Sequence, residues 1–212
     1  GPLSLGLVGI ASDHAGAWYV STEDSLLHVS PAGRVRCVAA LPASEVFYTV
    51  AVSPNRSVAF VADYENHKIR RGEVATGEVT TLAGSGTTGS ADGVGDAAQF
   101  CDPRGIAIRP DGGALFVADQ SGGFVADFIR RVEVATGEVT TIAGSGTTGI
   151  ADGVGDAAEF DCPDDMGNAP KKESSHVTRV GWDPPKIRGS LHLRPGGAGE
   201  RLPGCTISSF HD

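Results

Sequence analysis

The sequence predicts an all-β fold made of repeated units, each with four short antiparallel strands. Its 212 residues include 30 glycines and 12 prolines but only 6% aromatic residues. This composition suits short strands joined by tight turns better than a helical bundle. In addition, residues 72–100 and 132–160 are identical at all but four of their 29 positions. A near-verbatim repeat of this length is typical of folds that stack one supersecondary unit several times.

The clearest copy of the unit divides into four strands. Its first apolar run ends at a Pro-Asp-Gly-Gly sequence, and a Thr-Gly pair separates the third strand from the fourth. Both sequences favour turns. The four predicted strands are GIAIRP at 105–110, ALFVAD at 114–119, FIRRVEV at 128–134 and VTTIAG at 139–144. Four short antiparallel strands in each repeat predict the blade of a β-propeller.

The same pattern divides the chain into about three blades, which form a partial propeller. We expect a divergent first blade over 1–46, a second blade with its connector over 47–103, and a third blade with its connector over 104–163. Residues 164–212 are rich in Pro, Gly and charge and lack a sustained periodicity, which predicts a disordered or non-homologous tail. A splice or reading-frame change, or a natural flexible tail, explains the abrupt loss of the repeat. Since propellers close with about four to eight blades, further blades or self-association are needed to close this ring.

Several motifs recur in the same order. They are GIAI-x-PDG-x-x-LFVAD at 105–119, Asn-His-Lys-Ile-Arg at 66–70, and in both clear copies TG-x-VTT-[LI]-AG and DG-x-GDAA-x-F. This combination resembles the NHL repeat, and the last motif resembles the connection between blades of NHL propellers. The first copy lacks the PDG turn, and the third copy has an insertion after Asp119. The resemblance covers roughly 5–163 and implies a propeller that is one part of a larger multidomain protein.

Charge and motif content limit the classes of function. The formal net charge is −9, and an acidic surface repels a nucleic-acid backbone unless its basic residues cluster. The four cysteines form no CxxC pair, and no apolar run reaches the ~18 residues that span a bilayer. Nucleophile elbows, HExxH motifs, phosphate-binding loops and dinucleotide fingerprints are absent from the sequence. The sequence does not indicate a compartment.

Two groups of acidic residues have both a structural and a functional interpretation. Asp63 and Asp119 end predicted strands, where a carboxylate either accepts backbone N–H groups of the following turn or lines a central channel. The other group lies beside glycines in the linking segments, where carboxylates shape turns or bind calcium. Neither the EF-hand pattern nor the nonapeptide calcium repeat is matched, so a structural role is favoured. This second group comprises Asp92, Asp96, Asp152 and Asp156.

Basic residues recur on one predicted strand of each clear copy. Together with the variable loop 119–128, this strand supplies a candidate binding surface. Its residues are Asn66, His67, Lys68, Arg70, Arg71, Ser121, Phe124, Arg130 and Arg131. The resemblance implies RNA binding for such a positive face. The favoured interpretation is that the arginines form salt bridges on neighbouring strands with Glu73, Glu78, Glu133 and Glu138. His67 is expected to be a hydrogen-bonding residue of a turn and not a catalyst.

These observations together predict a non-catalytic platform for a protein or peptide partner, with no cofactor and no metal. Residues copied in each blade suit architecture better than catalysis, which needs one asymmetric arrangement. One alternative is a fragment of a six-bladed hydrolase or lyase with a central metal, of the lactonase, esterase or amidating-lyase kind. A second alternative is an RNA-binding module, which the net charge disfavours. A product without independent function is the remaining alternative.

Overall fold

The computed structural model shows an almost entirely β-stranded chain. The strands form three antiparallel sheets, accompanied by two single-turn 3-10 helices. The structure describes residues 7–13, 15–22, 25–40, 47–120, 127–161 and 163. This confirms the predicted all-β fold with three four-stranded blades, whereas the predicted tail at 164–212 lies outside the described residues. Within the described ranges, no helix has the length and apolar character needed to cross a membrane.

Each sheet uses consecutive strands in chain order. Blade 1 comprises β1 (Leu7–Ser12), β2 (Trp18–Thr22), β3 (Ser25–Val29) and β4 (Val35–Ala40). Blade 2 comprises β5 (Phe47–Val52), β6 (Val58–Asp63), β7 (Lys68–Glu73) and β8 (Val79–Ala83). Blade 3 comprises β10 (Asp102–Ile108), β11 (Ala114–Gln120), β12 (Phe128–Glu133) and β13 (Glu138–Ala143). The connectors after blades 2 and 3 hold β9 (Gly93–Val94) with η1 (Gly95–Ala97), and η2 (Gly155–Ala157).

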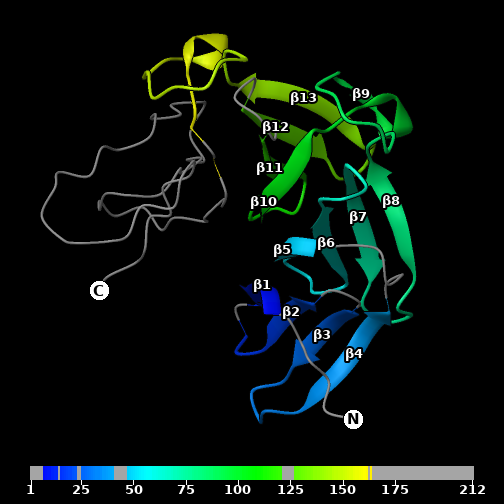
Figure 1. Cartoon of the computed structure of the whole chain (residues 1–212). Coiled ribbons are helices and arrows are strands. Elements are labelled where there is room, and N and C mark those ends of the chain that lie inside the picture. The colour runs from blue at the N-terminus through cyan, green and yellow to red at the C-terminus, as the bar shows by residue number, and fades with distance from the viewer. Residues whose placement is uncertain are drawn as a thin grey trace, which may run out of the picture.

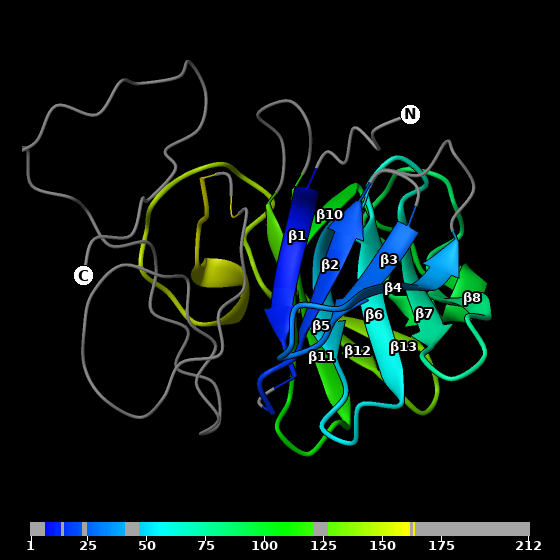
Figure 2. The same ribbon diagram turned by 90° about the horizontal axis from the view of Figure 1, so that it is seen from below.

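The three sheets are arranged as successive blades of an arc (Figure 1). Their first strands β1, β5 and β10 lie along one side of the stack, where β1 and β10 both contact β5. The later strands β4 and β8 lie along the opposite side. Figure 2 shows the sheets stacked face over face when the molecule is seen from below. A first strand at one edge and a fourth strand at the other is the arrangement of a propeller blade.

The strand register is the same in blades 2 and 3, and it places an arginine opposite a threonine. In blade 2, Ile69 pairs with Ala83 while Arg70 pairs with Thr81, so Leu82 is an extra residue in the outer strand. Blade 3 repeats this bulge, with Arg130 opposite Thr141. A bulge of this kind re-aims the side chains beside it.

The hydrophobic core lies between the blades. One cluster joins blades 1 and 2 through Tyr19, Leu26 and Val61. A larger cluster joins blades 2 and 3 through Phe60 and Leu115, among others. The middle blade has a neighbouring blade on both sides, so residues on both faces of its strands are buried. This explains why β6, in the middle blade, is buried along its whole length.

Replacing Gly77 by alanine is expected to lower the free energy of unfolding more than replacing Gly33. Both glycines have a φ of 75°, where alanine is strained by about 1–2 kcal/mol. A Cβ at Gly77 would lie 2.6 Å from the carbonyl oxygen of Val38 in blade 1, whereas a Cβ at Gly33 meets nothing within 4 Å. Urea unfolding of the two variants measures the difference. Equal losses would contradict a tight contact between blades 1 and 2.

Candidate functional site: the basic strands and the inter-blade arginine

The structure places most of the predicted binding residues on β7, β12 and the turn before β7. Ser121 and Phe124 lie outside the described residues, so their role stays a prediction. Since side chains alternate along a strand, adjacent arginines point to opposite faces of a sheet. Those facing the preceding blade are Arg70 and Arg130, and those facing the other way are Arg71 and Arg131.

The Asp63 carboxylate holds the turn that carries Asn66. Its Oδ1 accepts the backbone N–H of Asn66 at 3.3 Å and the side-chain amide N–H of Asn66 at 2.9 Å. Its Oδ2 accepts the Nε–H of Arg70 at 2.8 Å, and the Arg70 side chain is 17% exposed. Asp63 is buried. The predicted turn-shaping role is therefore confirmed for Asp63, and its burial does not fit the lining of a channel.

His67 links this turn to the start of blade 3. Its φ of 55° lies in the left-handed region that non-glycine residues seldom adopt. The Nδ1–H group donates to the carbonyl oxygen of Cys101, and Nδ1 lies 4.0 Å from Oδ1 of Asp102. These contacts agree with the predicted hydrogen-bonding role for this histidine. Lys68 follows at the start of β7 and packs beneath the connector, close to Gly84 and Gly86.

Arg130 is the centre of a buried network between blades 2 and 3. Its side chain is 0% exposed, so the prediction that it belongs to a binding surface is wrong. One guanidinium nitrogen donates to Oδ2 of Asp119 at 3.1 Å and to the carbonyl oxygen of Gln99 at 3.0 Å. The other donates to the carbonyl oxygen of Ala91 at 3.2 Å and to Oδ1 of Asp92 at 2.9 Å. A buried cation requires such pairing, and the connector after blade 2 supplies most of it.

Asp119 holds Arg130 from within blade 3. Its Oδ1 accepts the backbone N–H groups of Cys101 at 2.9 Å and Asp102 at 3.1 Å. These donors lie at the start of the blade, and the turn that follows Asp119 lies outside the described residues, so the predicted role of its carboxylate in that turn stays a prediction. Burial raises the pKa of Asp119 to about 7, against the opposing effects of Arg130 and the two N–H groups. Burial also raises the pKa of the Cys101 thiol, which keeps this free cysteine protonated and poorly nucleophilic.

Asp92 holds Arg130 from the connector and also anchors the outer strand of blade 3. Its Oδ2 accepts the backbone N–H of Thr141 at 3.0 Å, and its Oδ1 accepts the Thr141 hydroxyl at 2.9 Å. Next to it, β9 pairs with β13 and adds a fifth strand to blade 3. These contacts support the structural role predicted for Asp92. Among the described residues, no group of three or more His, Cys, Asp or Glu could hold a metal ion.

Arg71 and Arg131 remain at the surface, with side chains 40% and 39% exposed. Arg71 lies 2.7 Å from Oε1 of Glu73, and Arg131 forms the equivalent ion pair with Glu133. Each glutamate lies two residues further along the same strand. The predicted salt bridges to Glu73 and Glu133 therefore exist, but within one strand and not between neighbours, because residues i and i+2 share a face. Pairs with Glu78 and Glu138 are not among the salt bridges of these two arginines in the described part of the chain.

A groove of about 310 Å³ lies beside Arg71, between the turns of blades 2 and 3. Val58 and Phe60 contribute apolar surface to it. Its polar lining includes Arg71 and Asp111, and the serines and asparagine of the β5–β6 turn at Ser53, Asn55 and Ser57. Polar and apolar groups therefore both line this groove, and a ligand site needs both.

Sequence reasoning did not identify Thr141 as a partner of Asp92, or the carbonyl oxygens of Ala91 and Gln99 as partners of Arg130. A signal for this link is present in the sequence, because an arginine in the third strand recurs with a threonine in the fourth. Blades 2 and 3 carry the pairs Arg70–Thr81 and Arg130–Thr141, whereas blade 1 has Leu27 and Cys37 at the equivalent positions.

Comparison with curated proteins finds a partial relative. Protein SUPPRESSOR OF QUENCHING 1, chloroplastic, from Arabidopsis thaliana is 38% identical over 88 residues, which are 42% of this chain and 8% of that protein. No family model matches the chain. The chain therefore matches only a small part of this relative's length.

Solved structures with a similar fold are propeller-like proteins. An auxiliary nutrient binding protein from Bacteroides ovatus superposes with a TM-score of 0.61 at 19% identity, covering 76% of this chain and 42% of that chain. Its counterpart from Bacteroides thetaiotaomicron gives 0.59 at 20% identity, with coverages of 74% and 41%. A chain of the nidogen/laminin complex gives 0.53 at 16% identity, with coverages of 66% and 49%. The present chain thus spans less than half of these chains, and the likeness shows a β-propeller fold.

Proposed function

We propose that this propeller segment is of the NHL type and serves as a non-catalytic platform for a protein or peptide partner, as one part of a larger multidomain protein. The observation that carries the proposal is the groove between the turns of blades 2 and 3. Its lining offers both polar and apolar groups, and an extended peptide needs both kinds of contact for its backbone and side chains.

The charge of the exposed strands favours a protein partner over RNA. Arg71 and Arg131 are the arginines of β7 and β12 that lie at the surface, and each is paired with a glutamate. The two more buried arginines on these strands are paired with Asp63 and Asp119. Basic and acidic groups therefore alternate, and a strip of positive charge that could follow a phosphate backbone is not formed by these residues.

The acidic residues that repeat between blades support a platform more than a hydrolase or lyase. Asp63 and Asp119 are 0% exposed and hold arginines and backbone N–H groups. Their carboxylates are used to fix the blades and do not face a substrate. In blades 2 and 3 an aspartate at the same place holds the arginine of the third strand, and such repetition is architectural.

Replacing Arg71 by glutamate is expected to weaken peptide binding by roughly tenfold or more. The new carboxylate and that of Asp111 would then both line the groove, and like charges would replace the present pair of opposite charges. The full chain would be used to select ligands from a displayed library of random peptides. The affinity of a selected peptide would then be measured by calorimetry for the wild type and the variant. Arg36→Glu is the matched control, since Arg36 is exposed on β4, away from the groove.

Equal binding by the wild type and Arg71→Glu would show that the groove is not the site. Failure to select any peptide, combined with salt-sensitive binding of single-stranded RNA, would favour an RNA-binding module instead. Hydrolysis of lactones or esters by the full chain would favour the enzymatic alternative.

A further inference from the structure

The face of blade 1 that packs against blade 2 carries polar residues that the equivalent faces of blades 2 and 3 do not have. Tyr19 occupies the position of Phe60 and Phe116, because each of the three pairs with an alanine of the first strand in its blade. His28 lies opposite Tyr19 in β3, where blade 2 has Arg71. The repeated architecture is therefore broken at this face.

A third polar residue extends this series to the outer strand of blade 1. Arg36 of β4 lies opposite His28. Opposite residues of an antiparallel pair project from the same face of a sheet, so Tyr19, His28 and Arg36 form one line, here called the blade 1 row. The rings of Tyr19 and His28 meet edge to face, with their centroids 5.1 Å apart. Among the described residues, no carboxylate forms an ion pair with Arg36, and Ser30 takes the place of the glutamate that follows two residues later in blade 2.

The Tyr19 side chain is enclosed between blades 1 and 2, close to charged groups. The residue is 2% exposed and belongs to the cluster that joins these blades. Among the described residues, none forms a hydrogen bond with its hydroxyl, although a buried hydroxyl costs free energy without a partner. Burial raises the pKa of the Tyr19 hydroxyl, which therefore stays protonated and able to donate. The charges of Arg36, Asp13 and Arg56 also act on it, so these groups lie near.

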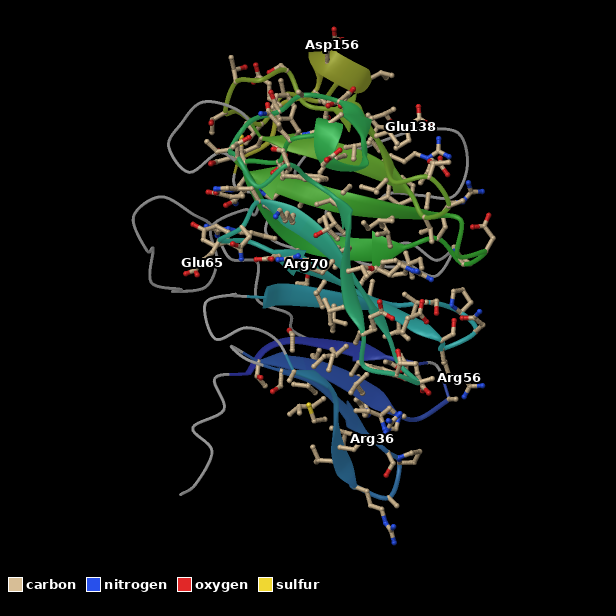
Figure 3. All side chains as sticks on the ribbon, turned by 90° about the vertical axis from the view of Figure 1, so that its right-hand side faces the viewer. Arg36, Arg56, Glu65, Arg70, Glu138 and Asp156 are labelled. Carbon is tan, nitrogen blue, oxygen red and sulfur yellow. The ribbon has the colours of Figure 1, made fainter. Side chains whose placement is uncertain are left out.

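Blade 2 contributes Arg56 from an unfavourable backbone position in the turn between β5 and β6. Arg56 corresponds to Gly112 of blade 3, since each N–H bonds the carbonyl three residues earlier at 2.8 Å. Its φ is 62°, which costs free energy for a residue with a side chain and is often found at functional sites. A guanidinium nitrogen of Arg56 lies 3.7 Å from Oδ2 of Asp13 in blade 1. Figure 3 shows Arg36 and Arg56 in the half of the molecule that carries blade 1, away from Asp156.

Asp13 holds the Arg56 guanidinium beside blade 1. Its Oδ1 accepts the N–H of Ala15 at 2.8 Å and that of Ala17 at 2.9 Å. Burial acts to raise the pKa of Asp13, but these two N–H groups and the charges of Arg56 and His28 bring it below its usual value. Asp13 is therefore ionised and balances one of the two arginines. The blade 1 row keeps a positive charge and a free hydroxyl donor beside it.

We propose that the blade 1 row and Arg56 bind a phosphate group, either free phosphate or a phosphate monoester. The donors come from β2, β3, β4 and the β5–β6 turn, so they approach from several directions. A phosphate group offers three strong acceptor oxygens and up to two charges, whereas a carboxylate offers two oxygens and one charge. Arginine is the preferred residue for such recognition. The site uses other residues than the groove beside Arg71 and stands independently of it.

The equivalent place between blades 2 and 3 does not have this chemistry. Phe60 has no hydroxyl, Arg71 is paired with Glu73, and Thr80 and Gly112 take the places of the two arginines. The site is therefore single and asymmetric, as a ligand site requires and a repeated architectural residue does not. One isolated site suits one phosphate group and not a nucleic-acid backbone, which needs many basic contacts.

The test measures binding of inorganic phosphate to the full chain by calorimetry at constant ionic strength, with acetate for comparison. Phosphate should bind roughly fivefold more tightly than acetate or better. Arg56→Gly should weaken phosphate binding by roughly tenfold or more and leave the melting temperature unchanged or raised, because glycine suits a positive φ. Tyr19→Phe, which restores the residue type of blades 2 and 3, should weaken binding by roughly threefold or more. Arg131→Gln, at an exposed arginine of blade 3, is the matched control and should have no effect.

Two further measurements sharpen the result. Tighter binding of O-phosphoserine than of inorganic phosphate would support the site and indicate a phosphorylated partner, and weaker binding would support it with free phosphate as the ligand. Arg36→Glu should abolish phosphate binding although it leaves the groove beside Arg71 intact, so the two proposals fail separately. No binding of phosphate, equal binding of phosphate and acetate, or phosphate binding that Arg56→Gly and Tyr19→Phe leave unchanged would overturn the proposal.

Discussion

Replacing Asp119 by alanine is expected to lower the free energy of unfolding by about 3–5 kcal/mol, because the change leaves the buried charge of Arg130 poorly compensated. Arg130 is fully buried, and of its two carboxylate partners among the described residues Asp119 is buried, whereas Asp92 is 48% exposed. The change also removes the acceptor of the Cys101 and Asp102 N–H groups. Urea unfolding of the full chain, followed by far-ultraviolet circular dichroism, measures the loss.

Two controls separate the buried charge from the loss of carboxylate contacts. Asp63→Ala removes the equivalent residue of blade 2, where Arg70 is partly exposed, so a smaller loss is expected. In the double variant Asp119→Ala/Arg130→Met, the buried charge is absent and more than half of the stability should return. A loss at Asp119 no greater than at Asp63, or a double variant less stable than the single one, would contradict this account.

Replacing Phe100 by alanine is expected to lower the free energy of unfolding by about 3–5 kcal/mol, the usual cost of emptying a buried aromatic position. Phe100 is 0% exposed and belongs to the cluster that joins blades 2 and 3. Its ring also lies 5.3 Å beneath the Arg130 guanidinium, so the cation loses part of its environment as well. The midpoint of urea unfolding is again the measurement.

Phe160→Ala is the matched control for this position. Phe160 is 1% exposed, and among the described residues its cluster contains only residues of blade 3 and of its own connector. We expect a smaller loss because the change affects no contact between described blades. If Phe160→Ala were as destabilising as Phe100→Ala, the special importance of the interface between blades 2 and 3 would be refuted.

The strands of blades 2 and 3 could be predicted from the sequence because short apolar runs and turn residues are local signals. The run at 139–144 appears as β13 at Glu138–Ala143, and the run at 114–119 appears as β11 with one further residue. Strand β10 begins earlier than its apolar run, at Asp102. The N–H groups of Cys101 and Asp102 bind Asp119 there, and this long-range contact has no local signal.

Which arginine is buried could not be predicted, because both faces of a blade can be covered. Alternation along the strand separates Arg130 from Arg131, but it does not say which face meets an acceptor. The acceptors of Arg130 are supplied by Ala91, Asp92 and Gln99, more than thirty residues away in the chain. Strand β9 could not be predicted either, because its formation depends on a distant partner strand. Gly93–Val94 forms a strand, whereas the identical Gly153–Val154 does not.

The near identity of the two connectors also affects how the chain reaches its native state. The inner connector is residues 84–100 and the terminal connector is residues 144–160. During refolding of a concentrated sample, the edge of β13 can pair with the inner connector of its own chain or with the terminal connector of another molecule, which offers the same acceptors. Exchange of identical elements between protomers is the basis of domain swapping, and misassembly of this kind is a characteristic failure of repeat proteins. The blade interface is therefore specified by proximity along the chain, because the competing segments are chemically almost equivalent. Divergence between neighbouring repeats would remove this ambiguity, and these two connectors have scarcely diverged.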